Sequence, residues 1–138
     1  MLRGVLAVPF AAILLAQTSS QPATIKQLML DLIHPASNDL LLFINRGGSS
    51  DEKEWAAVRR SALTLAESGN LLAARGPDRD NWASDAKLLA DAGTAAYQAA
   101  QARDLKALAA LAEPLDRACT TCHKHYRPDV FPRQGGSK

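Results

Sequence analysis

The chain has 138 residues, with 16 Lys and Arg side chains against 14 Asp and Glu. One domain is the natural expectation for this length. The charges are nearly balanced, and no basic cluster is interleaved with aromatic residues, so the electrostatic footprint of a nucleic-acid-binding protein is missing. Every apolar stretch beyond residue 23 is interrupted by charges, and we expect no membrane span there.

The first 23 residues have the pattern of a secretory signal peptide. Arg3 makes the beginning cationic, an apolar run follows from Val5 to Ala16, and a polar stretch then extends to Gln21. The apolar run is too short to cross a bilayer. We therefore expect residues 1–23 to be removed after export.

Helical periodicity fills most of the remaining chain. Apolar residues recur at intervals of three and four, and Gly, Pro, Ser or Asp residues separate the periodic segments, which cover about 24–44, 51–74, 79–101 and 104–126. Ser50 or Asp51 can cap the second segment, and Asp104 the fourth. Pro35 should kink or split the first segment, and Pro114 should bend the fourth.

The pattern predicts an all-α fold, an antiparallel up-down-up-down four-helix bundle, with no strand-like alternation anywhere. The bundle domain would cover residues 24–128, and residues 129–138 would form a loosely ordered tail. Core positions predicted for the first helix are Ile25, Leu28, Met29, Leu32, Ile33, Ala36, Leu40 and Phe43, and those predicted in the next two helices include Trp55, Trp82 and Tyr97.

One motif concentrates the chemistry of the chain, Cys119-Thr120-Thr121-Cys122-His123. Two thiols at this spacing can form thioethers with the vinyl groups of haem, and the adjacent imidazole can ligate the iron. Cys119, Cys122 and His123 stand at positions i, i+3 and i+4, so a helix presents them on one face. The motif predicts one covalent haem c near the end of the last helix, with His123 as the proximal ligand.

Two other interpretations of the cysteine pair have less support. A redox-active C-x-x-C usually opens a helix after a strand, and no strand is predicted. A zinc site would need a fourth ligand beyond Cys119, Cys122 and His123. His125 follows two residues after His123 and points to another face of the helix, where we expect it on the surface.

The bundle and the residues from Cys119 to Arg127 resemble the cytochrome c-prime family, the class II c-type cytochromes. Its members carry C-x-x-C-H-x-x-[YF]-R on the last helix of an antiparallel four-helix bundle, and Tyr126-Arg127 matches the final pair. The resemblance covers the mature chain, but only these motif residues are specific. It implies that Arg127 lies near the proximal side of the haem, where it could contact a propionate; otherwise Arg127 is a cation favoured by the helix C-terminus.

The second axial position of the iron decides between an electron carrier and a gas-binding protein. The family includes a branch with a methionine ligand from the first helix and a branch with an apolar distal pocket. Met29 is the only methionine besides the initiator. Counted along neighbouring antiparallel helices, Met29 and His123 would lie at similar depth. We therefore expect Met29 to be the distal ligand; the ordinary alternative is core packing.

His34 is the rival for the distal position. On a regular helix it lies about 7.5 Å deeper than Met29 and is rotated by about 140° from it, unless Pro35 distorts this geometry. Leu28 and Leu32 flank Met29, and either could instead wall off an open distal pocket.

These features predict a periplasmic monohaem cytochrome c that transfers single electrons to and from redox partner proteins. The alternative is a five-coordinate haem protein that binds NO or CO in an apolar distal pocket. An enzyme is not expected, because no distal His–Arg pair is evident. The family resemblance also allows a homodimer through the first two helices.

Overall fold

A computed structural model describes residues 22–79 and 81–129. Most of the predicted signal peptide and nearly all of the predicted tail lie outside the described residues. The described part contains no strand, and its helical elements are α1 (Ile25–Gln27), the π-helix η1 (Leu28–Ile33), α2 (His34–Asn45), α3 (Glu52–Arg75), α4 (Trp82–Gln101), α5 (Leu105–Ala109) and α6 (Ala112–Tyr126). None of these helices combines the length and the apolarity that a membrane crossing requires.

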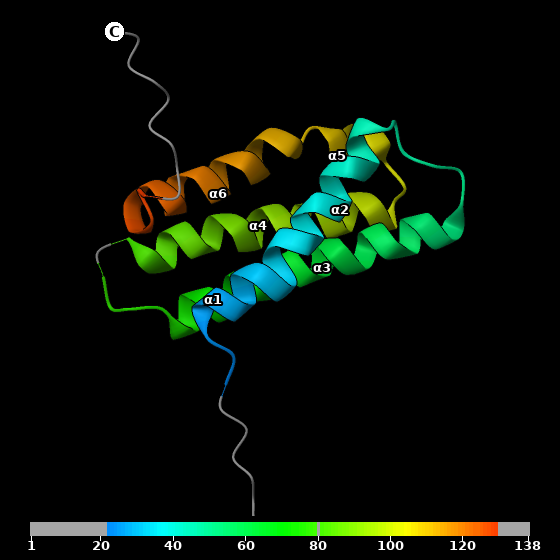
Figure 1. Cartoon of the computed structure of the whole chain (residues 1–138). Coiled ribbons are helices and arrows are strands. Elements are labelled where there is room, and N and C mark those ends of the chain that lie inside the picture. The colour runs from blue at the N-terminus through cyan, green and yellow to red at the C-terminus, as the bar shows by residue number, and fades with distance from the viewer. Residues whose placement is uncertain (1–21, 80, 130–138) are drawn as a thin grey trace, which may run out of the picture.

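These elements form four long segments that pack against each other (Figure 1). The first segment is α1, η1 and α2 in direct continuation, α3 and α4 are the second and third, and α5 with α6 is the fourth. The α2–α3 and α4–α5 connections lie at one end of the molecule. The α3–α4 connection, the start of α1 and the end of α6 lie at the other end (Figure 1).

Side-chain caps begin two of these segments as the sequence predicts. The Asp51 carboxylate accepts a hydrogen bond from the Lys53 backbone N–H at 2.8 Å, and Asp104 accepts one from Ala107 at 2.9 Å. Each bond satisfies a donor that has no partner within its own helix. The fourth segment is divided rather than bent: α6 begins two residues before Pro114. Proline is tolerated in a first helical turn, so a restart at Ala112 accommodates it.

The first segment is continuous across Pro35, and its irregularity is the π-helix η1. Pro35 has no N–H for the Asp31 carbonyl, and in a regular helix its ring would clash with that carbonyl. In η1 the turn is widened instead, so that the His34 N–H donates to the Met29 carbonyl, five residues before it. Pro35 is therefore accommodated by a wide turn, where the sequence predicted a kink or a break.

The wide turn changes which apolar residues face the core. Leu28 and Ile33, which are five residues apart, are both buried, whereas Leu32 is 39% exposed. The prediction that Leu32 belongs to the core was wrong, because it assumed regular helical spacing through this segment. The other core positions predicted for the first helix are buried or half-buried, as are Trp55, Trp82 and Tyr97.

Helices α3 and α4 approach each other closely. A Cβ atom added to Gly69 would lie 2.5 Å from the Ala90 backbone nitrogen, and one added to Gly93 would collide with the Ala66 backbone. Real Cβ atoms do not approach backbone so closely. Both positions therefore require glycine, and the two helices pack backbone to backbone.

Replacing Gly69 by Ala should destabilise the protein by about 1–3 kcal/mol, because the extra methyl group must push α3 and α4 apart. Chemical denaturation measures this loss. Asn70→Ala is the matched control at the adjacent exposed position of α3, and helix propensity predicts a gain of about half a kcal/mol there. A Gly69→Ala variant as stable as this control would contradict the close packing.

Candidate haem-attachment site

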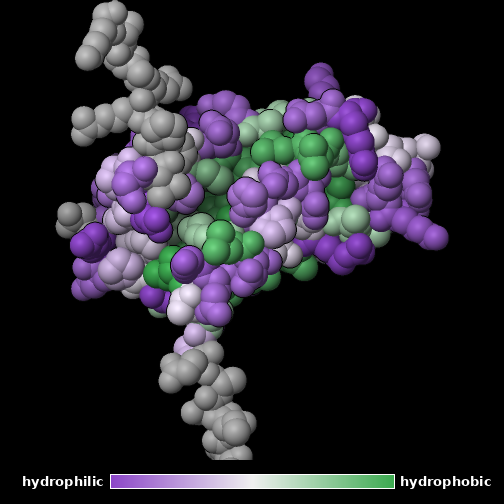
Figure 2. Space-filling model, viewed as in Figure 1, coloured by the Kyte–Doolittle hydropathy of each residue, from purple (hydrophilic) through white to green (hydrophobic). Residues whose placement is uncertain are grey.

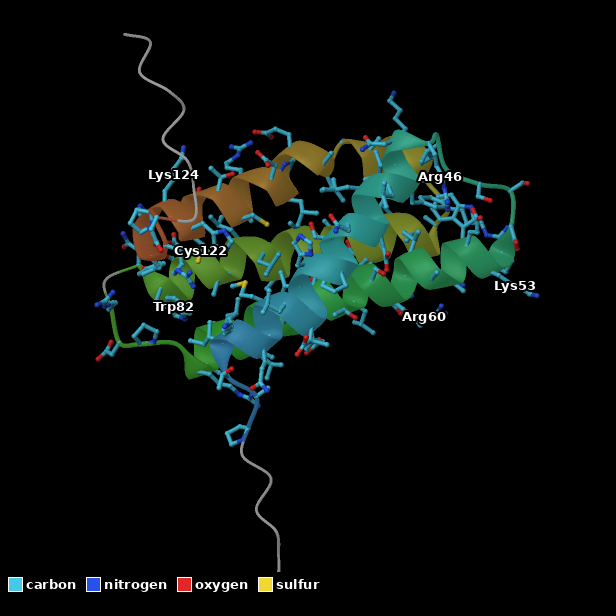
Figure 3. The ribbon with its side chains drawn as sticks, in the orientation of Figure 1. Arg46, Lys53, Arg60, Trp82, Cys122 and Lys124 are labelled. Atoms are coloured by element: carbon cyan, nitrogen blue, oxygen red, sulfur yellow. The ribbon has the colours of Figure 1, made fainter. Side chains whose placement is uncertain are left out.

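The cysteine motif lies in the C-terminal half of α6, which is a continuous helix through these residues. The side chains of Cys119, Cys122 and His123 are all half-buried. Their i, i+3 and i+4 relation therefore holds in the structure, and the three groups share one side of α6. Figure 3 shows Cys122 on the side of α6 that faces α4 and Trp82, whereas Lys124 extends away from the bundle.

Contacts with the beginning of α4 anchor the end of α6. The Tyr126 ring packs edge-to-face against Trp82, with centroids 4.8 Å apart. The Trp82 indole N–H in turn donates to the Leu72 carbonyl of α3 at 2.6 Å, and Gly76 leaves room for the indole ring. The three helices are thus joined directly beside the motif.

A second link was missed by sequence reasoning. The Asp85 carboxylate of α4 is 2.8 Å from the Nδ1 atom of His125, and the Asp85 residue is only 6% exposed. His125 is solvent-exposed, as expected, but it has a buried partner. The burial of Asp85 could have been predicted from the sequence, because Asp85 stands within the apolar stripe formed by Trp82, Ala86 and Leu89.

Burial shifts the proton affinities of the motif residues. Burial is the main cause that raises the pKa of Cys119, with the charge of Asp116 adding to it. The pKa of Cys122 rises to about 11, chiefly through burial and then through the charge of Asp85. Both thiols are therefore protonated near neutral pH, whereas a redox-active C-x-x-C needs a lowered thiol pKa.

The pKa of the His123 imidazole shifts in the opposite direction. Burial first, and the Arg127 charge second, lower its pKa. The neutral imidazole is favoured, and this form has the nitrogen lone pair that a metal requires.

The two cysteines are not joined in a disulfide. Within residues 22–79 and 81–129, no three His, Cys, Asp or Glu side chains gather as a metal-binding group.

Arg127 caps the C-terminus of α6. Its backbone N–H donates to the His123 carbonyl at 2.8 Å. Its side chain is exposed, and the Nε atom lies 3.8 Å from an Asp129 carboxylate oxygen. Its charge also contributes to the lowered pKa of the His123 imidazole. Contact with a propionate stays a prediction.

Met29 lies in η1, half-buried against the core. Among the described residues, η1 packs on α3, α6 makes its extensive helix contacts with α4, and α2 reaches α5. The first and last segments are therefore neighbours at α5, but η1 and α6 do not pack closely together. The start of the first segment and the end of α6 lie at the same end of the molecule (Figure 1). Met29 and His123 could bind the same iron only in such an arrangement.

The regular helix on which the rotation between Met29 and His34 was counted is not present in this segment. Instead, the π-turn joins the two residues directly through the His34 N–H and the Met29 carbonyl. Their side chains nevertheless differ in burial, since His34 is exposed and Met29 is half-buried. Burial therefore favours Met29 over His34 as a ligand for a group held within the bundle.

Apolar surface is visible on the face of the molecule that carries the first segment and α6 (Figure 2). Among the exposed large hydrophobic residues, Leu30, Leu32 and Leu42 belong to the first segment. Leu28, beside Met29, is buried. Of the two leucines that flank Met29, only Leu28 can therefore contribute to an apolar wall inside the bundle.

Comparison with known proteins identifies no relative: no family model matches the chain, and no curated protein or solved structure does. The function must therefore be inferred from the residues of the chain and their arrangement.

The raised thiol pKa values predict slow alkylation of the folded chain when it is produced without attached haem. With a pKa of about 11 instead of 9.0, Cys122 should react with iodoacetamide at pH 8 about 100-fold more slowly than an unperturbed thiol. The rate should climb as pH rises toward 11. Unfolding in concentrated urea should remove the difference, and equally fast alkylation of the folded and unfolded chains at pH 8 would contradict the assigned burial.

Proposed function

We propose that this protein is a periplasmic monohaem c-type cytochrome with a c-prime-like, up-down-up-down helical bundle, and that it transfers single electrons. The observation that carries the proposal is the C-x-x-C-H motif on one continuous helix, with both thiols half-buried and unoxidised. The order of two cysteines followed directly by a histidine is the pattern of c-type haem attachment, and the raised thiol pKa values disfavour a redox-active cysteine pair.

The residues present fit a covalent haem. Cys119 and Cys122 would hold it through thioethers, which prevent its loss, and His123 would ligate the iron from the same face of α6. When bound, haem c supplies the Fe(III)/Fe(II) couple for electron transfer. Arg127, four residues after His123, would contact a propionate or adjust the electrostatic environment of His123.

Met29 is the proposed distal ligand. A methionine side chain is flexible and polarizable, and the wide turn η1 places this one at the border of the core rather than deep within it. Ligation by both His123 and Met29 would keep the iron six-coordinate in both oxidation states. Thioether ligation also raises the reduction potential.

One observation favours a second function, the binding of NO or CO. Because η1 and α6 make no extensive contact in the described structure, nothing in the protein alone forces the Met29 side chain toward His123. If Met29 stays on the core, buried Leu28 helps to form an apolar distal side. Five-coordinate iron would then take a diatomic ligand.

The proposed signal peptide, residues 1–23, supports the periplasmic location, since covalent haem attachment takes place after export. The partners we propose are redox proteins. The exposed leucines of the first segment, such as Leu30 at 59% and Leu42 at 64% exposure, are compatible with a homodimer through the first two helical segments.

Removing the sulfur atoms tests haem attachment. Wild-type protein exported by a host with cytochrome c maturation should keep its haem through denaturing electrophoresis, as shown by haem peroxidase staining. The Cys119→Ala/Cys122→Ala variant should show no stain, because no thioether can form. Thr120→Ala/Thr121→Ala is the matched control within the same turn and should stain normally. Staining of the double cysteine variant would contradict the proposal.

Replacing Met29 distinguishes the two candidate functions. An electron carrier should show low-spin spectra and a weak thioether-to-iron charge-transfer band when oxidised, and Met29→Ala should convert it to a high-spin form that binds CO after reduction. Leu32→Ala is the control on the exposed side of the same turn. If the wild type is already high-spin and Met29→Ala leaves its spectrum unchanged, the gas-binding function is the correct one.

A further inference from the structure

Asp85 is the one acidic residue that is buried among those the structure describes. Its side chain is 8% exposed and lies in the first turn of α4, where the helix dipole favours a negative charge. A buried carboxylate is rarely tolerated without a partner. The partner here is His125, whose Nδ1 atom is 2.8 Å from the Asp85 Oδ2 atom. Because an ionised carboxylate only accepts hydrogen bonds, the Nδ1–H donates.

This pair lies directly beside the cysteine motif. His125 follows Cys122 by three residues, so the two side chains are neighbours on the surface of α6. Asp85 approaches this turn from α4, the helix toward which Cys122 lies in Figure 3. The charge of Asp85 also acts on the Cys122 thiol, whose pKa it raises. The carboxylate is therefore close to the sulfur that would hold the haem.

Two adjacent residues of α6 are thus tied to the first turn of α4. The His125 bond to Asp85 is directional, and the Tyr126 ring packs edge-to-face on Trp82. Trp82 and Asp85 are themselves one helical turn apart. Together these contacts determine how the turn that carries Cys122 and His123 lies against α4.

Resting on the proposed haem attachment, we propose that the Asp85–His125 pair positions the haem-bearing turn of α6 and that the Asp85 charge lowers the reduction potential of the iron. Oxidised iron has one more positive charge than reduced iron, so a nearby buried carboxylate stabilises the oxidised form. His125 is a positioning residue, which holds the carboxylate and the helix turn together.

Asp85→Asn tests the charge. The amide oxygen can still accept the His125 hydrogen bond, so only the negative charge is lost. At a fixed ambient potential, the ratio of reduced to oxidised holoprotein should rise about tenfold. Asp91→Asn is the matched control: it lies on the same helix and removes the same charge, but its side chain is 62% exposed beside Lys87. Solvent screening should keep its effect within about twofold.

His125→Ala tests whether His125 positions the last turn of α6, and this test can be made on protein without haem. Loss of the ring frees the last turn of α6, so hydrogen exchange of its amides, including the Arg127 N–H that bonds to His123, should accelerate about tenfold. In His125→Gln an amide donor remains, and exchange should stay near the wild-type rate. Wild-type exchange in His125→Ala would overturn the positioning role.

The outcomes separate this inference from the proposed function. A haem-loaded Asp85→Asn protein whose potential moves no more than that of Asp91→Asn overturns the inference and leaves the cytochrome intact. A wild-type chain without porphyrin overturns the proposed function and, with it, the potential-setting role. If Asp85→Asn does not fold, His125→Ala carries the test without haem: amide exchange at the wild-type rate in the last turn of α6 overturns the inference.

Discussion

Gly69 lies against the backbone of Ala90, and Gly93 against that of Ala66, so α3 and α4 pack with no side chain between them at these points. This inner pair organises the rest of the described structure, since η1 and α2 pack on α3, whereas α6 packs on α4. The first segment and α6 are therefore held chiefly by different helices. Their relative position depends on the α3–α4 contact rather than on extensive packing between η1 and α6.

The geometry of the cysteine motif accordingly depends on the first turn of α4. Trp82 holds Tyr126, Asp85 holds His125, and the Trp82 indole N–H is bonded to Leu72 of α3. Cys122 and His123 each lie three positions before one of these two residues, so contacts with α4 determine their position although they belong to α6. The first segment, which contains Met29, packs on α3 instead.

Residue type and spacing predicted those features of the fold that depend on neighbouring residues in the sequence. The helical periodicity, the caps at Asp51 and Asp104, and the buried positions of Trp55 and Trp82 followed from spacing and residue type. The π-turn before Pro35 did not, because a proline can be accommodated by a kink, a break or a wide turn, and residue spacing does not distinguish them. The place of Asp85 in an apolar stripe indicates a buried carboxylate, but its partner His125 is 40 positions away, and spacing does not identify that partner. The motif itself was evident from the sequence, but ligation by Met29 is a tertiary property and stays a prediction.

The most direct test of the central claim is the intact mass of the mature chain after export from a host that matures c-type cytochromes. We predict the mass of the processed polypeptide plus one haem, and peptide mapping should place the added group on the segment that contains Cys119 and Cys122. The mass of the bare polypeptide, with both thiols free for alkylation after unfolding, would contradict the assignment.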